Sequence, residues 1–148
     1  MVVHAFNQFS IRASNDDLFL LRDFYCRVIG LTLGPTPPGR SAGFWLYAND
    51  LPVLQLASTL RARSLVHVRN RRRPTDHVAF ASSGLHTVVD RLRANRVQHW
   101  IGTDHALQRV MLTVHDPAGV RVEIAFQPEA EGLSQTTLVG LHAWRGDS

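Results

Sequence analysis

The sequence is short of cysteine, of lysine and of long apolar runs. Cys26 is the only cysteine, so no intrachain disulfide can form, and we interpret this residue as inert helix filler. No apolar stretch approaches the length of a bilayer-spanning helix, and the first residues lack a basic region followed by an apolar one. We therefore expect no membrane span and no signal peptide, and a cytoplasmic location.

Because lysine is absent, all 16 basic residues are arginine, and the formal net charge is +4. Six of these arginines fall within the segment 61–73. Such a cluster could attract nucleic acid or an anionic small molecule. No aromatic residue interleaves with the arginines and no nucleic-acid-binding motif accompanies them, so we interpret the segment as a solvated connecting loop and expect no nucleic-acid partner.

Hydrophobic periodicity predicts a similar series of elements twice, within one domain of 148 residues. The first series is a strand at 7–13, a helix at 16–30 and two strands within 44–58. The second series is a strand at 76–82, a helix at 84–97 and a hairpin within 109–126. Asn15 or Asp16 is the expected N-cap of the first helix, and Gly30 suits the left-handed position at its end.

Polar residues in the two series match at a nearly constant offset. His77 follows Gln8 by 69 residues, and Glu123 follows Gln55 by 68 residues. Two pairings with almost the same offset indicate an internal duplication. The chain, one domain spanning 1–148, then consists of module one at about 6–60, module two at about 74–127, and a tail at 128–148.

Strand alternation places each of these four polar residues on a face with small neighbours and leaves the bulky residues on the opposite face. Small residues around isolated polar groups favour a concave, partly open surface. The predicted metal ligands are Gln8, Gln55, His77 and Glu123. Such a nitrogen and oxygen set could hold a divalent ion of the Zn, Ni, Co, Mn or Fe type, although two of the donors are neutral amides and weak ligands.

Each of these four residues also has a structural interpretation. His77 could cap the end of a strand beside Asp76, and Glu123 could form a salt bridge with Arg121 or Arg12. Glutamines in strands are often hydrogen-bonded interior amides, so Gln8 and Gln55 are the weaker candidates.

At this point the chain resembles a known family. The stretch "DFYCRVIGLTLG" after the first strand, "DHVAF" opening the second half and "HDPAGVRVEI" near the end are similar to the vicinal oxygen chelate superfamily. That group includes glyoxalase I, extradiol dioxygenases and bleomycin-resistance proteins. The resemblance covers roughly residues 6–127. It implies an α+β fold of two βαβββ modules, whose curved mixed sheets surround a cavity with the helices on the outer face.

The resemblance also implies functional roles. Its metal positions correspond to the four predicted ligands, Glu123 would be the catalytic base as well as a ligand, and small members pair as homodimers. Gln55 departs from the family, which carries Glu or His there. A ring-cleaving oxygenase, which needs two histidines, is not expected unless His4 or His105 replaces a ligand.

Four further residues complete the candidate site. Arg109, Gln108 and Arg12 are predicted to hold an anionic or oxygen-rich small-molecule substrate, and the alternative for Arg109 and Gln108 is a rim position with no partner. Asp76 is predicted to orient the ring of His77. The leading hypothesis is a glyoxalase-like, metal-dependent lyase or isomerase that stabilises an oxyanion or enolate. The alternative is a metal-free binding or sequestering protein of the bleomycin-resistance type, because tight divalent binding needs more strong donors than this set supplies.

Overall fold

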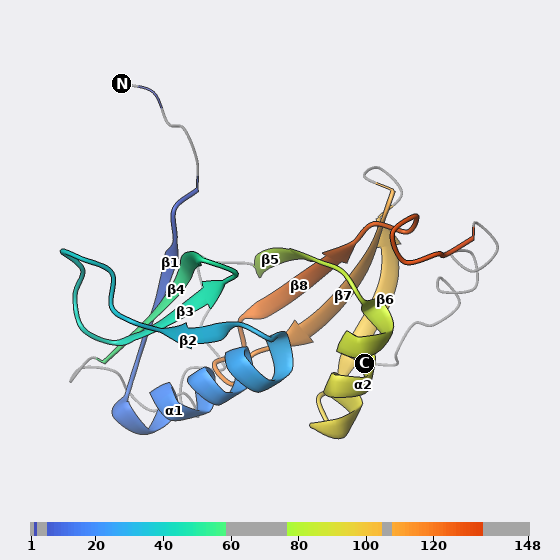
Figure 1. Ribbon diagram of the computed structural model, residues 1–148. Helices are drawn as coiled ribbons and strands as arrows, with labels where there is room; N and C mark the ends of the chain where they lie inside the picture. The colour runs from blue at the N-terminus through green and yellow to red at the C-terminus, as the bar shows by residue number, and fades with distance from the viewer. Residues whose placement is uncertain (1, 3–5, 59–76, 105–107, 135–148) are drawn as a thin grey trace. The chain divides into compact units, whose positions relative to one another are not determined.

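The computed structural model describes residues 2, 6–58, 77–104 and 108–134, and it divides the chain into a first unit (Met1–Arg71) and a second unit (Arg72–Ser148) (Figure 1). The first unit contains β1 (Phe9–Ala13), α1 (Asn15–Asp23), a π-helical turn η1 (Phe24–Ile29), β2 (Thr32–Gly34), β3 (Phe44–Ala48) and β4 (Leu51–Ser58). The second unit contains β5 (His77–Ser82), α2 (Leu85–Ala94), β6 (His99–Asp104), β7 (Arg109–His115) and β8 (Arg121–Phe126).

The two units share one topology. Their sheets have the orders β1-β4-β3-β2 and β5-β8-β7-β6, and in each unit the first and last strands pair in parallel while the other pairs are antiparallel. Ser10, two residues after Gln8, pairs with Gln55, and Ala79, two residues after His77, pairs with Glu123. The predicted duplication and the α+β class with βαβββ modules are therefore confirmed.

Residue patterns alone missed two strands, and the predicted helix cap was wrong. The residue patterns did not indicate β2 and β6, because β2 has only three residues and β6 shows no alternation of buried and exposed positions. The N-cap of α1 is Ser14, not Asn15 or Asp16, because the Ser14 hydroxyl accepts a hydrogen bond from the backbone N–H of Asp17. The helix therefore begins one residue earlier than expected, at Asn15.

The predicted helix at 16–30 also changes character along its length. Its second half is η1, where the N–H of Gly30 reaches the carbonyl of Tyr25. The helix ends as predicted, with Gly30 in the left-handed region at φ 96°. Among the residues that the structure describes, no helix is long and apolar enough to cross a membrane.

Each unit has its own apolar core. The apolar residues that recur at helical spacing along the two predicted helices are buried, namely Leu18, Leu21, Tyr25 and Val28 in the first unit and Leu85, Val88, Val89 and Leu92 in the second. In the second sheet, Val122, Ile124 and Phe126 of β8 are buried, whereas Arg121, Glu123 and Ala125 between them are half-buried. This alternation leaves one face of the second sheet for polar chemistry.

The turn between β7 and β8 is held by Asp116, whose side chain is buried. Its Oδ1 accepts the backbone N–H of Val120 at 2.8 Å, and its carbonyl accepts the N–H of Gly119 at 2.8 Å. Gly119 has φ 78°, a left-handed conformation that glycine adopts without strain. This turn lies at the end of the antiparallel pair and sets the register of β8 against β7, with His115 opposite Arg121.

We expect Asp116→Ala to lower the free energy of unfolding by about 1–3 kcal/mol, because the buried N–H of Val120 loses its acceptor. Urea unfolding measures this value. Asp90→Ala is the matched control. Its side chain is 78% exposed and lies 3.8 Å from Arg93, so its removal should change stability by less than about 0.5 kcal/mol. Equal stability losses in both variants would contradict the role assigned to Asp116.

Candidate functional site on the second sheet

The open face of the second sheet is organised in rows of cross-strand neighbours. Backbone register defines four rows across the strands. The first is a polar row of His77, Arg121 and His115, and the second contains Ala79, Glu123, Thr113 and Trp100. The third contains Ala81, Ala125, Met111 and Gly102, and the last is the pair Arg109 and Asp104. All of these side chains are exposed or half-buried. The middle of the face therefore combines the small residues Ala79, Ala81, Ala125 and Gly102 with Met111 and Trp100, and it lies between a polar row at one end and an arginine at the other.

Three side chains at one end of this face form a closed cluster, which we name the His–Arg–Glu cluster (His77, Arg121 and Glu123). His77 Nε2 lies 3.7 Å from Glu123 Oε2, and Arg121 Nε lies 3.4 Å from Glu123 Oε1. Arg121 Nη2 lies 3.1 Å from His77 Nδ1. The structure thus brings two predicted ligands together, and it also shows the ion pair between Arg121 and Glu123 that sequence reasoning had kept as the alternative.

The cluster does not fit a divalent metal ion in this arrangement. His77 and Glu123 offer two donors, whereas zinc sites in proteins use three or four protein ligands. Among the residues that the structure describes, no three His, Cys, Asp or Glu side chains are gathered closely enough to hold a metal ion. The guanidinium of Arg121 contacts both donors, so an incoming dication would meet a positive charge already in place.

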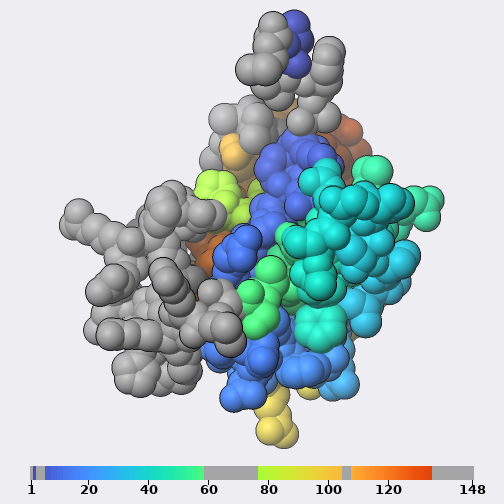
Figure 2. Space-filling view, turned by 90° about the vertical axis from the view of Figure 1, so that its left-hand side faces the viewer, coloured from blue at the N-terminus to red at the C-terminus, as the bar shows by residue number. Residues whose placement is uncertain are grey.

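Gln55, at the equivalent position of the first unit, has a different environment. Its side-chain Nε2 contacts the carbonyl of Ser41 at 3.1 Å, the hydroxyl of Ser41 at 2.8 Å and the carbonyl of Ala42 at 3.3 Å. Its Oε1 accepts the Ser10 hydroxyl at 3.1 Å. The residue is buried, and these contacts hold the segment 35–43 against β4. Figure 2 shows this segment, in cyan, beside the dark blue β1.

The expected open face is therefore wrong for β4. Gln55 and Ala57 are buried like the leucines on the other side of the strand, because the segment 35–43 covers them. Trp45 Nε1 also donates to the Ser41 carbonyl. Gly43 ends the segment with φ 146°, and a Cβ there would overlap the carbonyl oxygen of Leu56, so only glycine fits.

Two further predicted residues, Gln8 and Arg12, belong to the first unit. Gln8 is half-buried just before β1, and Arg12 is exposed on β1 opposite Ala57. Gln8, Gln55 and Arg12 belong to the first unit and His77 and Glu123 to the second. The four-donor metal site and the substrate role of Arg12 stay predictions.

Arg109 and Gln108 lie at the far end of the open face. Arg109 begins β7 beside Asp104, and among the described residues its buried Nε has no hydrogen-bond partner. Gln108 is exposed, with φ 49°. Asp76, His4, His105 and the arginine-rich segment 61–73 lie outside the described residues.

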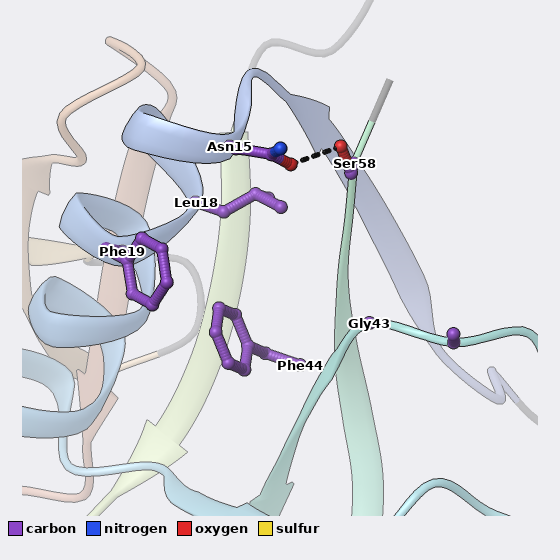
Figure 3. Close-up of a pocket in the computed structure, with 7 residues that line it drawn as sticks. Asn15, Leu18, Phe19, Gly43, Phe44 and Ser58 are labelled. Carbon is purple, nitrogen blue, oxygen red and sulfur yellow. Dashed lines mark hydrogen bonds between the residues drawn. The ribbon is translucent and has the colours of Figure 1, made fainter. Parts of the chain in front are cut away.

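Sequence reasoning did not foresee a pocket in the first unit. Its volume is about 530 Å³, and α1 lines it with Leu18 and Phe19 opposite Phe44 (Figure 3). At one end the Ser58 hydroxyl donates to Asn15. Phe19, which lines this pocket, is 51% exposed. In the sequence, an aromatic residue outside the apolar face of the predicted helix was the one sign that a pocket could form here.

Cys26 is a poor nucleophile. Burial raises the pKa of its thiol above the ordinary value, while the nearby Arg22 opposes this shift only in part. The thiolate is the reactive form, so the neutral thiol prevails at physiological pH. The expectation of an inert cysteine agrees with this environment.

Solved structures show which fold the chain adopts. It is similar to a protein assigned to the glyoxalase family from Bacillus anthracis, at 17% identity and a TM-score of 0.61, with 86% of this chain and 98% of that chain covered. It is also similar to lactoylglutathione lyase from Agrobacterium tumefaciens, at 20% identity and a TM-score of 0.57, with 82% and 92% covered. A third similar structure is TnmS3, an antibiotic binding protein from Streptomyces sp. CB03234, at 15% identity and a TM-score of 0.58, with 86% and 98% covered.

No family model matches the sequence, and no curated protein matches it. At such low identities these structures establish the fold alone. The chain has the vicinal oxygen chelate fold of glyoxalases and bleomycin-resistance proteins. Homodimer formation, which that resemblance implied, stays a prediction.

The environment of Gln55 makes a specific prediction for Gln55→Glu. A carboxylate cannot donate to the carbonyls of Ser41 and Ala42, so we expect the free energy of unfolding to fall by about 2–4 kcal/mol. Urea unfolding tests this expectation. Ser10→Ala, which removes one contact to Oε1, should cost only about 1 kcal/mol. Unchanged stability together with tighter metal binding in Gln55→Glu would instead support the ligand role.

Proposed function

We propose that the chain is a metal-free binding protein for a small, oxygen-rich molecule, held on the open face of the second sheet. The observation that carries this proposal is the row of Ala81, Ala125, Met111 and Gly102, mostly small residues, with polar groups beyond it at both ends. A Cβ added at Gly102 would have nothing within 4 Å, so there is open space directly above this position. Few polar groups around a small-residue surface are typical of small-molecule sites.

The charges on this face indicate the kind of ligand. Arg109 and Arg121 supply two positive charges, and Asp104 and Glu123 supply two negative charges. The face is therefore not a plain anion site. A molecule that carries hydroxyl groups as well as a carboxylate or carbonyl would satisfy both the donors and the acceptors.

Arg109 is the anchor for the anionic end of such a ligand. Its buried Nε lacks a partner among the described residues, and a buried donor without an acceptor costs free energy. Arg121 Nε also has no hydrogen bond among the described residues, but its guanidinium is engaged by the ion pair with Glu123 and by His77. The ligand body would then lie over the row next to Arg109, where Ala125 is found. An antibiotic binding protein with the same fold is consistent with this kind of function.

Salicylate is a suitable probe, because it combines a carboxylate, a hydroxyl and an apolar ring. We expect it to bind in buffer containing EDTA. We expect Arg109→Gln to raise the dissociation constant of salicylate about tenfold, equivalent to about 1.4 kcal/mol of lost binding free energy. Isothermal titration calorimetry measures both values. Arg93→Gln on α2, where the side chain is 71% exposed, should bind like the unaltered protein. If folded Arg109→Gln binds salicylate as tightly as the unaltered protein does, Arg109 is not the anchor of the ligand.

A glyoxalase-like lyase or isomerase is the second candidate, and the close approach of His77 and Glu123 favours it. In that case the metal would act as a Lewis acid, and Glu123 would accept the substrate proton. His77 and Glu123 would be ligands together with Gln8 and Gln55. This function requires Arg121 to leave its present contacts.

Elemental analysis after purification without chelators separates the two candidates. The binding-protein proposal predicts less than about one-tenth of a metal ion per chain, because two donors beside a guanidinium hold a dication weakly. One equivalent of Zn, Ni, Co, Mn or Fe that is lost in Glu123→Gln would favour the enzyme instead. His86→Gln, an exposed substitution on α2, should leave the metal content unchanged.

A further inference from the structure

We propose that Arg121 fixes which ring nitrogen of His77 carries the proton, and that this keeps divalent metal ions off the pair of His77 and Glu123. The inference deepens the proposed metal-free function and rests on it. It assigns the metal preference of the site to one residue, which sequence reasoning had treated only as an alternative partner of Glu123.

The hydrogen-bonding chemistry of the two side chains sets the tautomer. Arg121 Nη2 lies 3.1 Å from His77 Nδ1. A guanidinium has only N–H donors, so Nδ1 must accept, and the single proton of the neutral ring then lies on Nε2. Nε2 is the nitrogen 3.7 Å from Glu123 Oε2, and its N–H therefore faces the carboxylate.

A histidine that binds a metal ion together with Glu123 would need the proton on the other ring nitrogen. The ligating nitrogen must be bare, while the other nitrogen donates its proton to a neighbouring acceptor. In His77 the bare nitrogen faces Arg121, and the nitrogen that faces Glu123 is protonated. The ring thus presents a donor where a metal would need a lone pair.

The spacing of the pair is otherwise close to that of two ligands on one ion. Two donors about 2.1 Å from a tetrahedral zinc ion lie roughly 3.4 Å apart. The observed separation between His77 Nε2 and Glu123 Oε2 is 3.7 Å. The guanidinium and the tautomer, rather than the distance, are therefore what disfavour a metal here.

Backbone geometry makes this cluster hard to avoid. Arg121 and Glu123 are two residues apart on β8 and share a face, and the parallel register places His77 directly opposite Arg121. Arg121 Nε also lies 3.4 Å from Glu123 Oε1, where the carboxylate is 19% exposed. The arginine supplies the positive charge that this half-buried carboxylate needs.

The tautomer can be measured directly in the unaltered protein. Long-range ¹H–¹⁵N NMR correlations of the His77 ring, assigned by comparison with His77→Gln, should show a proton on Nε2 and a bare Nδ1 at pH 7.5. A proton on Nδ1 would overturn the inference. This measurement needs no variant of Arg121, so it decides the matter even if such a variant fails to fold.

Substitution of Arg121 tests the consequence for metal binding. We expect Arg121→Leu to bind Zn²⁺ at least tenfold more tightly than the unaltered protein by titration calorimetry, and the gain to disappear when His77→Ala is added. Arg121→Lys keeps a donor and a positive charge, and it should show no gain. A folded Arg121→Leu protein without tighter Zn²⁺ binding, or an equal gain in Arg121→Lys, would overturn the inference.

Failure of this inference is distinguishable from failure of the proposed function. If the tautomer and the Zn²⁺ gain are as expected but salicylate does not bind the unaltered protein, the binding function alone fails. If salicylate binds but Arg121→Leu gains no Zn²⁺ affinity, the inference about Arg121 alone fails.

Discussion

The parallel pairing of the first and last strands in each unit is the constraint on which the candidate site depends. It places residues about 44 positions apart in the sequence side by side, so that His77 lies opposite Arg121 and Ala79 opposite Glu123. Parallel strands cannot be joined by a tight turn, and here the helix and the intervening strands provide the connection. The arrangement of the strand residues on the open face follows from this register and from strand alternation.

The two units have diverged at equivalent positions within this shared topology. Glu123 in the second sheet is half-buried beside a guanidinium, whereas Gln55 in the first sheet is buried beneath the segment 35–43. An amide has both a donor and an acceptor, so it can bond to the covering backbone and to Ser10 together. In the first unit, Gln55 holds the covering segment 35–43 in place. In the second unit, Glu123 stays partly exposed.

Much of this fold could be predicted from the sequence because the relevant signals are periodic. Helix faces such as Leu85 and Val88, the turn at Asp116 and the repeat offset between Gln8 and His77 all follow from local patterns and spacing. The strand β2 could not be predicted, because three residues carry no period and its place is set by pairing with β3. The proximity of His77 and Glu123 followed from the repeat.

The environments of the individual site residues were harder to predict. That Gln55 is covered depends on where the segment 35–43 folds, and a segment rich in proline and glycine has no pattern that reports its path. That Arg121 reaches both His77 and Glu123 depends on side-chain rotamers, which strand parity leaves open.

The backbone at Gly43 limits which substitutions this chain can tolerate. Most positions of the covering segment are exposed and can accept many side chains, but position 43 excludes any Cβ because the carbonyl of Leu56 lies directly against it. Homologues that keep this covering segment should therefore vary mainly at its exposed positions that make no contact with Gln55, while they retain glycine immediately before β3. A relative with another residue there would have to carry the segment along a different path, and its first sheet would then present an uncovered polar position.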